Sequence, residues 1–278
     1  MVGSARELLP LGIQFTSANL INSIYTEGRS LVIGKFYSSA DLAFFNRGNQ
    51  FPALIVGNLN TPISNVMLPL MAEKKDSQYA LKSVLRKAMQ LSAYLVFPMM
   101  GILAACAHPL VLVLLGQKWA ECVPYLQVAC LFYLFQPLQS MNWQALKAAG
   151  QGSLCFKLEV IKKAISFIVL IMSIPFGVFA ISLSSAFCGF VSMLINMTPN
   201  KKVLGYGIFE QLIDVLKPSI ATLFSVVIAL LLIHISNGNL ISLIVAPLGS
   251  LGCYIVLSKL MNIEGFNLLM DKLSLRRN

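Results

Sequence analysis

Long apolar blocks recur along the chain and are separated by short polar or charged segments. A block of about 20 apolar residues crosses the ~30 Å hydrocarbon core of a bilayer as a helix. Apolar residues make up 57% of the 278 residues and charged residues only 12%, whereas about 25% of a soluble domain is charged. Alternation of the barrel type does not recur, so we predict an all-α integral membrane protein.

The apolar blocks predict about eight transmembrane helices. Charged or turn-forming segments such as "AEKKDSQ", "GQKWAE" and "PNKKVLGYG" separate them. The predicted spans are residues 10–33, 41–71, 84–106, 122–146, 153–174, 177–197, 212–234 and 239–261. The last two spans carry few polar side chains, and we expect them to face lipid.

Positive charges lie mainly on one side of the predicted spans. All Lys and Arg residues except Arg29, Lys35, Arg47 and Lys118 fall on the side that holds both termini. Since Lys and Arg favour cytoplasmic loops, we expect both termini in the cytoplasm. This topology, with contact to anionic lipid, accounts for the net charge of +10, so we infer no nucleic-acid partner.

Enzyme and metal motifs are not found in the sequence. "GRSLVIGKF" resembles a phosphate-binding loop, but five residues separate Gly28 from Gly34 where that loop has four, and Phe36 stands where it needs Ser or Thr. The six cysteines show no CxxC pairing and the two histidines are far apart. We therefore expect the cysteines to serve packing, and we predict no metal, no other cofactor and no enzymatic activity.

Two charged residues, Glu27 and Arg29, lie inside the first predicted span. At about 100° per residue, the polar residues of this segment fall within about 160° of arc. They are Thr16, Asn19, Asn22, Ser23, Thr26, Glu27, Arg29 and Ser30. Since residues i and i+2 do not face each other on a helix, Glu27 and Arg29 each need a partner elsewhere.

Two interpretations of this polar face are open. In one, Arg29 snorkels to the outer interface and Glu27 pairs with a neighbouring helix. In the other, the face lines an aqueous cavity within a helical bundle. We favour the cavity because snorkelling does not explain the uncharged polar residues on the same face. Asn19, Asn22, Glu27 and Arg29 are then candidate substrate-binding residues.

Other spans supply further cavity candidates. Arg47 and Gln50 lie in the second span, which is rich in amides and is interrupted by prolines, a pattern typical of a bent helix facing a polar interior. Gln136 and Gln139 lie in the fourth span, near Trp143. These amides are suited to sugar hydroxyls and the ring to a sugar face. Hydrogen bonding between helices is an equally open role for each amide.

Four phrases occur in a specific order: "RSLVIGKFYSSADLAFFNRGNQFP", "TPISNVMLPLMAEKKDS", "HPLVLVLLGQKWAECVPYLQVACL" and "ALKAAGQGS". In this order and spacing they resemble the second half of bacterial polysaccharide flippases. These are the O-antigen, colanic-acid and exopolysaccharide translocases (lipopolysaccharide biosynthesis proteins) of the multidrug/oligosaccharidyl-lipid/polysaccharide exporter superfamily. The resemblance covers most of residues 6–200.

The resemblance implies a fold and a function. Such proteins have two six-helix lobes around a central cavity, often followed by two extra helices. They move undecaprenyl-pyrophosphate-linked oligosaccharide across the bacterial inner membrane by alternating access, without ATP. Basic cavity residues receive the pyrophosphate and acidic sugars. By this resemblance Arg29 and Arg47 hold anionic substrate, and Glu27 couples protons or balances charge.

The resemblance also implies a domain organisation. Residues 1–200 correspond to the second six-helix lobe and residues 201–278 to an additional two-helix hairpin with a basic cytoplasmic tail. We therefore expect a fragment or half of a transporter, completed by an N-terminal lobe or a second chain. The expected partners are lipid-linked oligosaccharide, membrane lipid and polysaccharide assembly enzymes. A drug or lipid-precursor exporter of the same superfamily, and a non-transporting membrane scaffold, are the alternatives.

Overall fold

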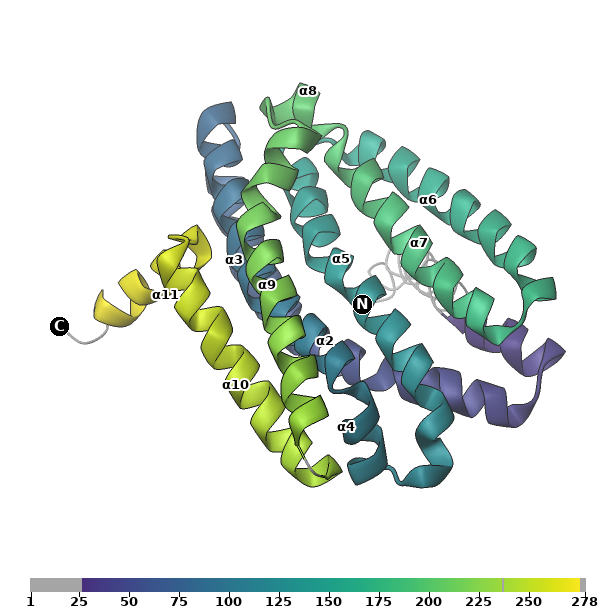
Figure 1. Ribbon diagram of the computed structural model, residues 1–278. Helices are drawn as coiled ribbons and strands as arrows, with labels where there is room; N and C mark the ends of the chain where they lie inside the picture. The colour runs from purple at the N-terminus through teal and green to yellow at the C-terminus, as the bar shows by residue number, and fades with distance from the viewer. Residues whose placement is uncertain (1–26, 237, 276–278) are drawn as a thin grey trace, which may run out of the picture.

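The computed structural model describes the backbone of residues 27–236 and 238–275, and the side chains of residues 27–236 and 238–270. The described part is a bundle of long, slanted helices (Figure 1). Residues 27–36 are helical. The other elements are α2 (Ser39–Glu73), α3 (Gln78–Ala105), α4 (Ala107–Leu114), η1 (Gln117–Cys122), α5 (Val123–Ala148), α6 (Gly152–Ser173), η2 (Ile174–Phe176), α7 (Val178–Met197), α8 (Asn200–Leu204), α9 (Ile208–Ile235), α10 (Asn239–Leu260) and α11 (Glu264–Leu275).

Four stretches of the described chain are long and apolar enough to cross a membrane. They are α3, Val178–Leu204, α9 and α10. The prediction of an all-α membrane protein is confirmed, whereas the number of eight spans stays a prediction. α2, α5 and α6 coincide with predicted spans but carry more polar side chains, and most of the predicted span 10–33 lies outside the described residues.

Helix α5 lies at the centre of the bundle and packs against α2, α3 and α7. The crossing of α2 and α5 is close because Gly48 has no side chain. A Cβ atom at Gly48 would lie 2.8 Å from the backbone nitrogen of Leu126. This contact holds the polar first half of α2 beside α5. All six cysteines are free and five are buried, which fits the packing role expected for them.

The helix of residues 27–36 is held against α2, α6 and α7. Its Ile33 is buried in an apolar cluster with Leu170 of α6 and Ile181 of α7. At its end, the Tyr37 hydroxyl donates to the carbonyl of Ile174. The chain then turns into α2 through a capping box in which the Ser38 hydroxyl accepts a hydrogen bond from the Asp41 backbone N–H. This packing places Arg29 beside Ser166 of α6.

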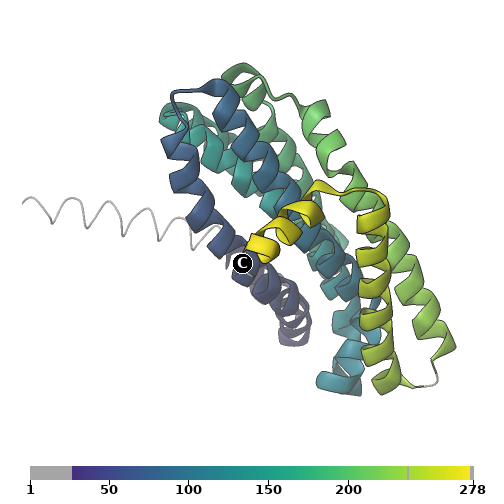
Figure 2. The same ribbon diagram turned by 90° about the vertical axis from the view of Figure 1, so that its left-hand side faces the viewer.

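Helices α9 and α10 form a hairpin that packs on α3 (Figures 1 and 2). α11 follows and lies across α3, where Gly265 permits close contact. A Cβ atom there would lie 2.5 Å from the Cβ of Tyr94. Much of the hairpin's surface is apolar and exposed, as the sequence predicts for lipid-facing helices.

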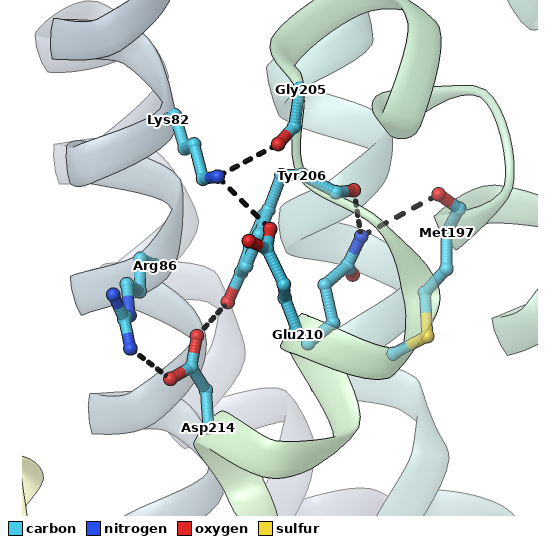
Figure 3. Close-up of polar contacts among 8 residues, drawn as sticks. Lys82, Arg86, Met197, Gly205, Tyr206, Glu210 and Asp214 are labelled. Atoms are coloured by element: carbon cyan, nitrogen blue, oxygen red, sulfur yellow. Dashed lines mark hydrogen bonds and ion pairs between the residues drawn. The ribbon is translucent and has the colours of Figure 1, made fainter.

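One edge of α9 differs from that expectation, because it carries a polar network to α3 (Figure 3). The Asp214 side chain is only 5% exposed and pairs with Arg86 of α3 at 2.5 Å. It also accepts a hydrogen bond from the Tyr206 hydroxyl. Nearby, Lys82 pairs with Glu210 at 2.9 Å. The network therefore fixes α9 on α3 at the basic end of both helices.

Tyr206 serves this network as a hydrogen-bond donor. Its side chain is almost fully buried. Burial, together with the neighbouring Asp214 carboxylate, raises the pKa of Tyr206 well above that of a free phenol. The hydroxyl therefore keeps its proton at neutral pH and donates a hydrogen bond to Asp214.

Replacing Asp214 with Ala is expected to lower stability by about 2 kcal/mol, because the Tyr206 hydroxyl is left buried without an acceptor. The measurement is thermal unfolding of the purified chain in detergent. Glu210→Ala is the matched control, since Glu210 is exposed and its pair with Lys82 contributes little. Equal midpoints for the two variants would contradict this assignment.

Candidate functional site

A cavity of about 490 Å³ lies between the helix of residues 27–36, α2, α5, α6 and α7. Its lining is rich in polar side chains. The lining residues are Glu27, Arg29, Ser30, Phe45, Asn46, Asn49, Phe132, Tyr133, Gln136, Gln139, Glu159, Lys162, Ser166, Ser185, Cys188, Gly189 and Ser192. The cavity thus combines four charged side chains with amides, hydroxyls and aromatic rings, a composition suited to a polar, charged ligand.

Arg29 is placed in this cavity by the packing of its helix on α6. Its Nη2 donates to the Ser166 hydroxyl at 3.1 Å. Its Nε is buried and has no hydrogen-bond partner within the described residues. The ion pairs Lys82–Glu210, Arg86–Asp214 and Lys162–Glu159 do not include Arg29 or Glu27. Arg29 therefore offers the cavity a cation with unused donor capacity.

Helix α6 brings a second cation to the cavity, Lys162, together with Glu159, and the sequence analysis predicts neither as a site residue. Lys162 pairs with Glu159 at 2.6 Å, and its side chain is only 10% exposed. Its Nζ lies 4.7 Å from the centroid of the Trp143 ring. The charge count had grouped Lys162 with the basic cytoplasmic residues. Glu159, Lys162 and Ser166 are spaced at i, i+3 and i+7, so they share one face of α6. This spacing is the signal in the sequence that points to Lys162 as a cavity residue.

The two predicted glutamines of α5 both line the cavity, but they are engaged differently. The Gln139 amide donates to the Gly189 carbonyl of α7 at 2.9 Å, and its backbone carbonyl accepts from Asn196 at 3.3 Å. Gln139 therefore also joins α5 to α7, the alternative role that the sequence left open. Gln136 lines the cavity beside it.

Arg47 and Gln50 lie in a neighbouring hollow of about 540 Å³ on α2. The Arg47 guanidinium donates to the Gln50 side-chain oxygen at 2.8 Å and lies 5.2 Å from the centroid of the Trp119 ring. Asn46 and Asn49 line both hollows, so the two are adjacent. The structure therefore does not bring Arg47 and Gln50 into the Arg29 cavity.

The remaining candidates, Asn19 and Asn22, lie outside the described residues. Their assignment to the cavity stays a prediction.

Helix α7 separates the cavity from an apolar hollow on its other face. Ser185 and Ser192 line the cavity, whereas Leu183, Phe187 and Phe190 line the apolar hollow with residues of α5. This division is the one expected of a helix between a polar interior and lipid.

Segments of this chain are similar to known proteins of polysaccharide biosynthesis. Residues 1–124 match a family described as polysaccharide biosynthesis protein. The teichuronic acid biosynthesis protein TuaB of Bacillus subtilis (strain 168) is 22% identical over 151 residues, which are 54% of this chain and 31% of that protein. The lipopolysaccharide biosynthesis protein WzxC of Escherichia coli (strain K12) is 23% identical over 154 residues, covering 55% of this chain and 31% of that protein.

A third relative is the succinoglycan biosynthesis transport protein ExoT of Rhizobium meliloti (strain 1021). It is 25% identical over 139 residues, which are 50% of this chain and 28% of that protein. The matched segments thus span about a third of these relatives. Among solved structures, the lipid II flippase MurJ in its inward closed conformation superposes with a TM-score of 0.76 at 14% identity, over 92% of this chain and 55% of that one.

The described chain is a helical membrane protein whose fold is similar to that of a lipid II flippase. More specifically, the resemblance to polysaccharide flippases that the sequence predicts is confirmed, because the matching family and the three relatives all serve polysaccharide biosynthesis or its transport.

The two faces of the bundle should differ in access to water. In a variant freed of its native cysteines, we expect Asn46→Cys, in the cavity, to react with a membrane-impermeant maleimide far faster than Phe187→Cys. Both positions are exposed in the chain, but thiolate forms readily only where water reaches it. The measurement is labelling of cells or of open membrane vesicles. Equal labelling of both positions would contradict a water-filled cavity.

Proposed function

We propose that the chain is one lobe, with an additional hairpin, of a flippase for undecaprenyl-pyrophosphate-linked oligosaccharide in surface polysaccharide biosynthesis. The observation that carries the proposal is the cavity in which Arg29 faces polar side chains of α2, α5, α6 and α7. A cation with unused donors inside a membrane-spanning bundle is costly unless a ligand or water engages it.

The chemistry of the cavity fits the two parts of such a substrate. The Arg29 guanidinium is suited to phosphate oxygens, which it can bind by paired hydrogen bonds. Gln136, Asn46 and Asn49 are suited to sugar hydroxyls. Together they replace water around a headgroup that could not cross hydrocarbon alone. The lipid tail stays outside, where the helices expose apolar side chains.

The proposal includes the organisation of the whole assembly. Residues 1–200 form the second lobe and residues 201–278 the additional hairpin, in the inner membrane, with both termini in the cytoplasm. The opposite wall of the cavity comes from an N-terminal lobe or from a second chain. Alternating access then follows from rocking of this lobe against its partner. Polysaccharide assembly enzymes supply and consume the substrate.

A lipid-precursor exporter is the second candidate, and the fold likeness to a lipid II flippase favours it. Both candidates carry a polyprenyl diphosphate, so Arg29 has the same role in each. They differ in the process that fails when the chain is lost, which is surface glycan display in one and cell-wall synthesis in the other. A non-transporting scaffold would instead depend on its loops and tolerate loss of Arg29.

Complementation of a strain that lacks its polysaccharide flippase tests the proposal. The chain is expressed together with the first lobe of a related flippase, and surface glycan is scored by gel. We expect rescue by the parent chain and a loss of on the order of 10-fold or more for Arg29→Ala, because a charge-assisted contact of about 1.5–3 kcal/mol is removed.

Arg29→Lys keeps the charge and is expected to retain part of the rescue, whereas Lys35→Ala, which removes a cation outside the cavity, serves as the matched control. Undiminished glycan in Arg29→Ala, with the protein present in the membrane, would contradict a transport role for the cavity.

A further inference from the structure

The two cations of the cavity are held in different ways. Arg29 donates to the neutral hydroxyl of Ser166 at 3.1 Å. Lys162 is paired with the carboxylate of Glu159 at 2.6 Å and lies over the Trp143 ring. Only one of the two cations therefore already has an anion beside it among the described residues.

Lys162 stands nearer than Ser166 to the basic end of the bundle. It precedes Ser166 by four residues, which is about 6 Å along α6, and its side chain reaches back toward Glu159, one turn closer to the start of the helix. Lys147, at the end of α5, lies 5.4 Å from the centroid of the same Trp143 ring. Trp143 is thus bracketed by two ammonium groups at the end of the bundle that we assign to the cytoplasm.

Burial makes Lys162 dependent on an anion. Its side chain is 10% exposed, whereas that of Glu159 is 37% exposed. Removing the partner of a buried charge is strongly destabilising, and a ring face compensates only in part. A phosphate group carries more charge than a carboxylate and offers more acceptor oxygens. It can therefore replace Glu159, which is free to turn toward water.

We propose that Glu159 is an internal competitor of the substrate's diphosphate for Lys162. The inference rests on the proposed function. In the absence of substrate, Glu159 neutralises Lys162 against Trp143. A diphosphate that arrives from the cytoplasm displaces the Glu159 carboxylate and takes Lys162 as its first partner. It next meets Arg29, which is bonded to Ser166 one turn further along α6. Glu159 pairs with Lys162 again when the diphosphate leaves.

The test uses the full chain with Trp119→Phe, which leaves Trp143 as the one remaining tryptophan of the two in the sequence. The probe is farnesyl diphosphate, a short prenyl diphosphate, and farnesol is the uncharged counterpart. We expect the diphosphate alone to change Trp143 fluorescence. Glu159→Gln should bind it about 5-fold more tightly, because about 1 kcal/mol of competing ion pairing is removed.

Variants of the partner residue complete the test. Lys162→Met should bind the diphosphate more weakly and lose the change in Trp143 fluorescence, and Lys162→Arg should retain both. Glu73→Gln makes the same change at an exposed residue at the end of α2 and should match the parent. Glu159→Ala should also bind the diphosphate more tightly, which would show that the gain does not come from hydrogen bonds of the new glutamine side chain. Elution of each variant as a single species in detergent establishes that it is folded.

The outcomes separate this inference from the proposed function. Unchanged or weaker binding by Glu159→Gln, while Arg29→Ala loses affinity, would overturn the competitor role and leave the anion site of the cavity in place. Unchanged binding by both Arg29→Ala and Lys162→Met would overturn the inference and the proposed function together.

Discussion

A charged group inside an apolar helical bundle must find a partner, and this constraint organises the described chain. Asp214 meets Arg86 and Tyr206, and so fixes the α9–α10 hairpin on α3. Lys162 meets Glu159. Arg29 meets the Ser166 hydroxyl and keeps donors unused among the described residues. Asp214 and Lys162 thus have their partners within the described chain. Arg29 has unused donors, which fits a cavity where a ligand supplies the acceptor.

Close helix packing gives the cavity its walls. The absence of a side chain at Gly48 lets α2 approach α5, and at Gly189 it lets α7 approach the ring of Phe132 on α5. Because α5 is held at the centre by these contacts, the polar residues of α2, α5 and α7 face one space. The apolar residues of α7 face the other side. The polar cavity and the apolar hollow are thus separated by one helix, α7.

The sequence predicts the fold class and part of the site, because some of its patterns are local whereas contacts between helices are not. Apolar blocks and helical periodicity are local, so the helices and the inward face of Glu27 and Arg29 were predictable. Which helices become neighbours is not local. Arg47 was therefore grouped with Arg29, although it lies over Trp119 in an adjacent hollow. Charge alone places Lys162 on the cytoplasmic side, and the apolar character of α9 predicts a lipid-facing helix, although Asp214 of that helix pairs with Arg86.

Photo-crosslinking to a radiolabelled undecaprenyl-pyrophosphate-linked oligosaccharide tests whether the substrate binds in the Arg29 cavity. A photoreactive phenylalanine derivative is placed at Gln136, in the Arg29 cavity, or at Gln50, in the Arg47 hollow, and each chain is assembled with a first lobe. We expect a strong crosslink from position 136 that is lost when Arg29 is changed to Ala. A crosslink from position 50 alone, or one from position 136 that does not depend on Arg29, would contradict it.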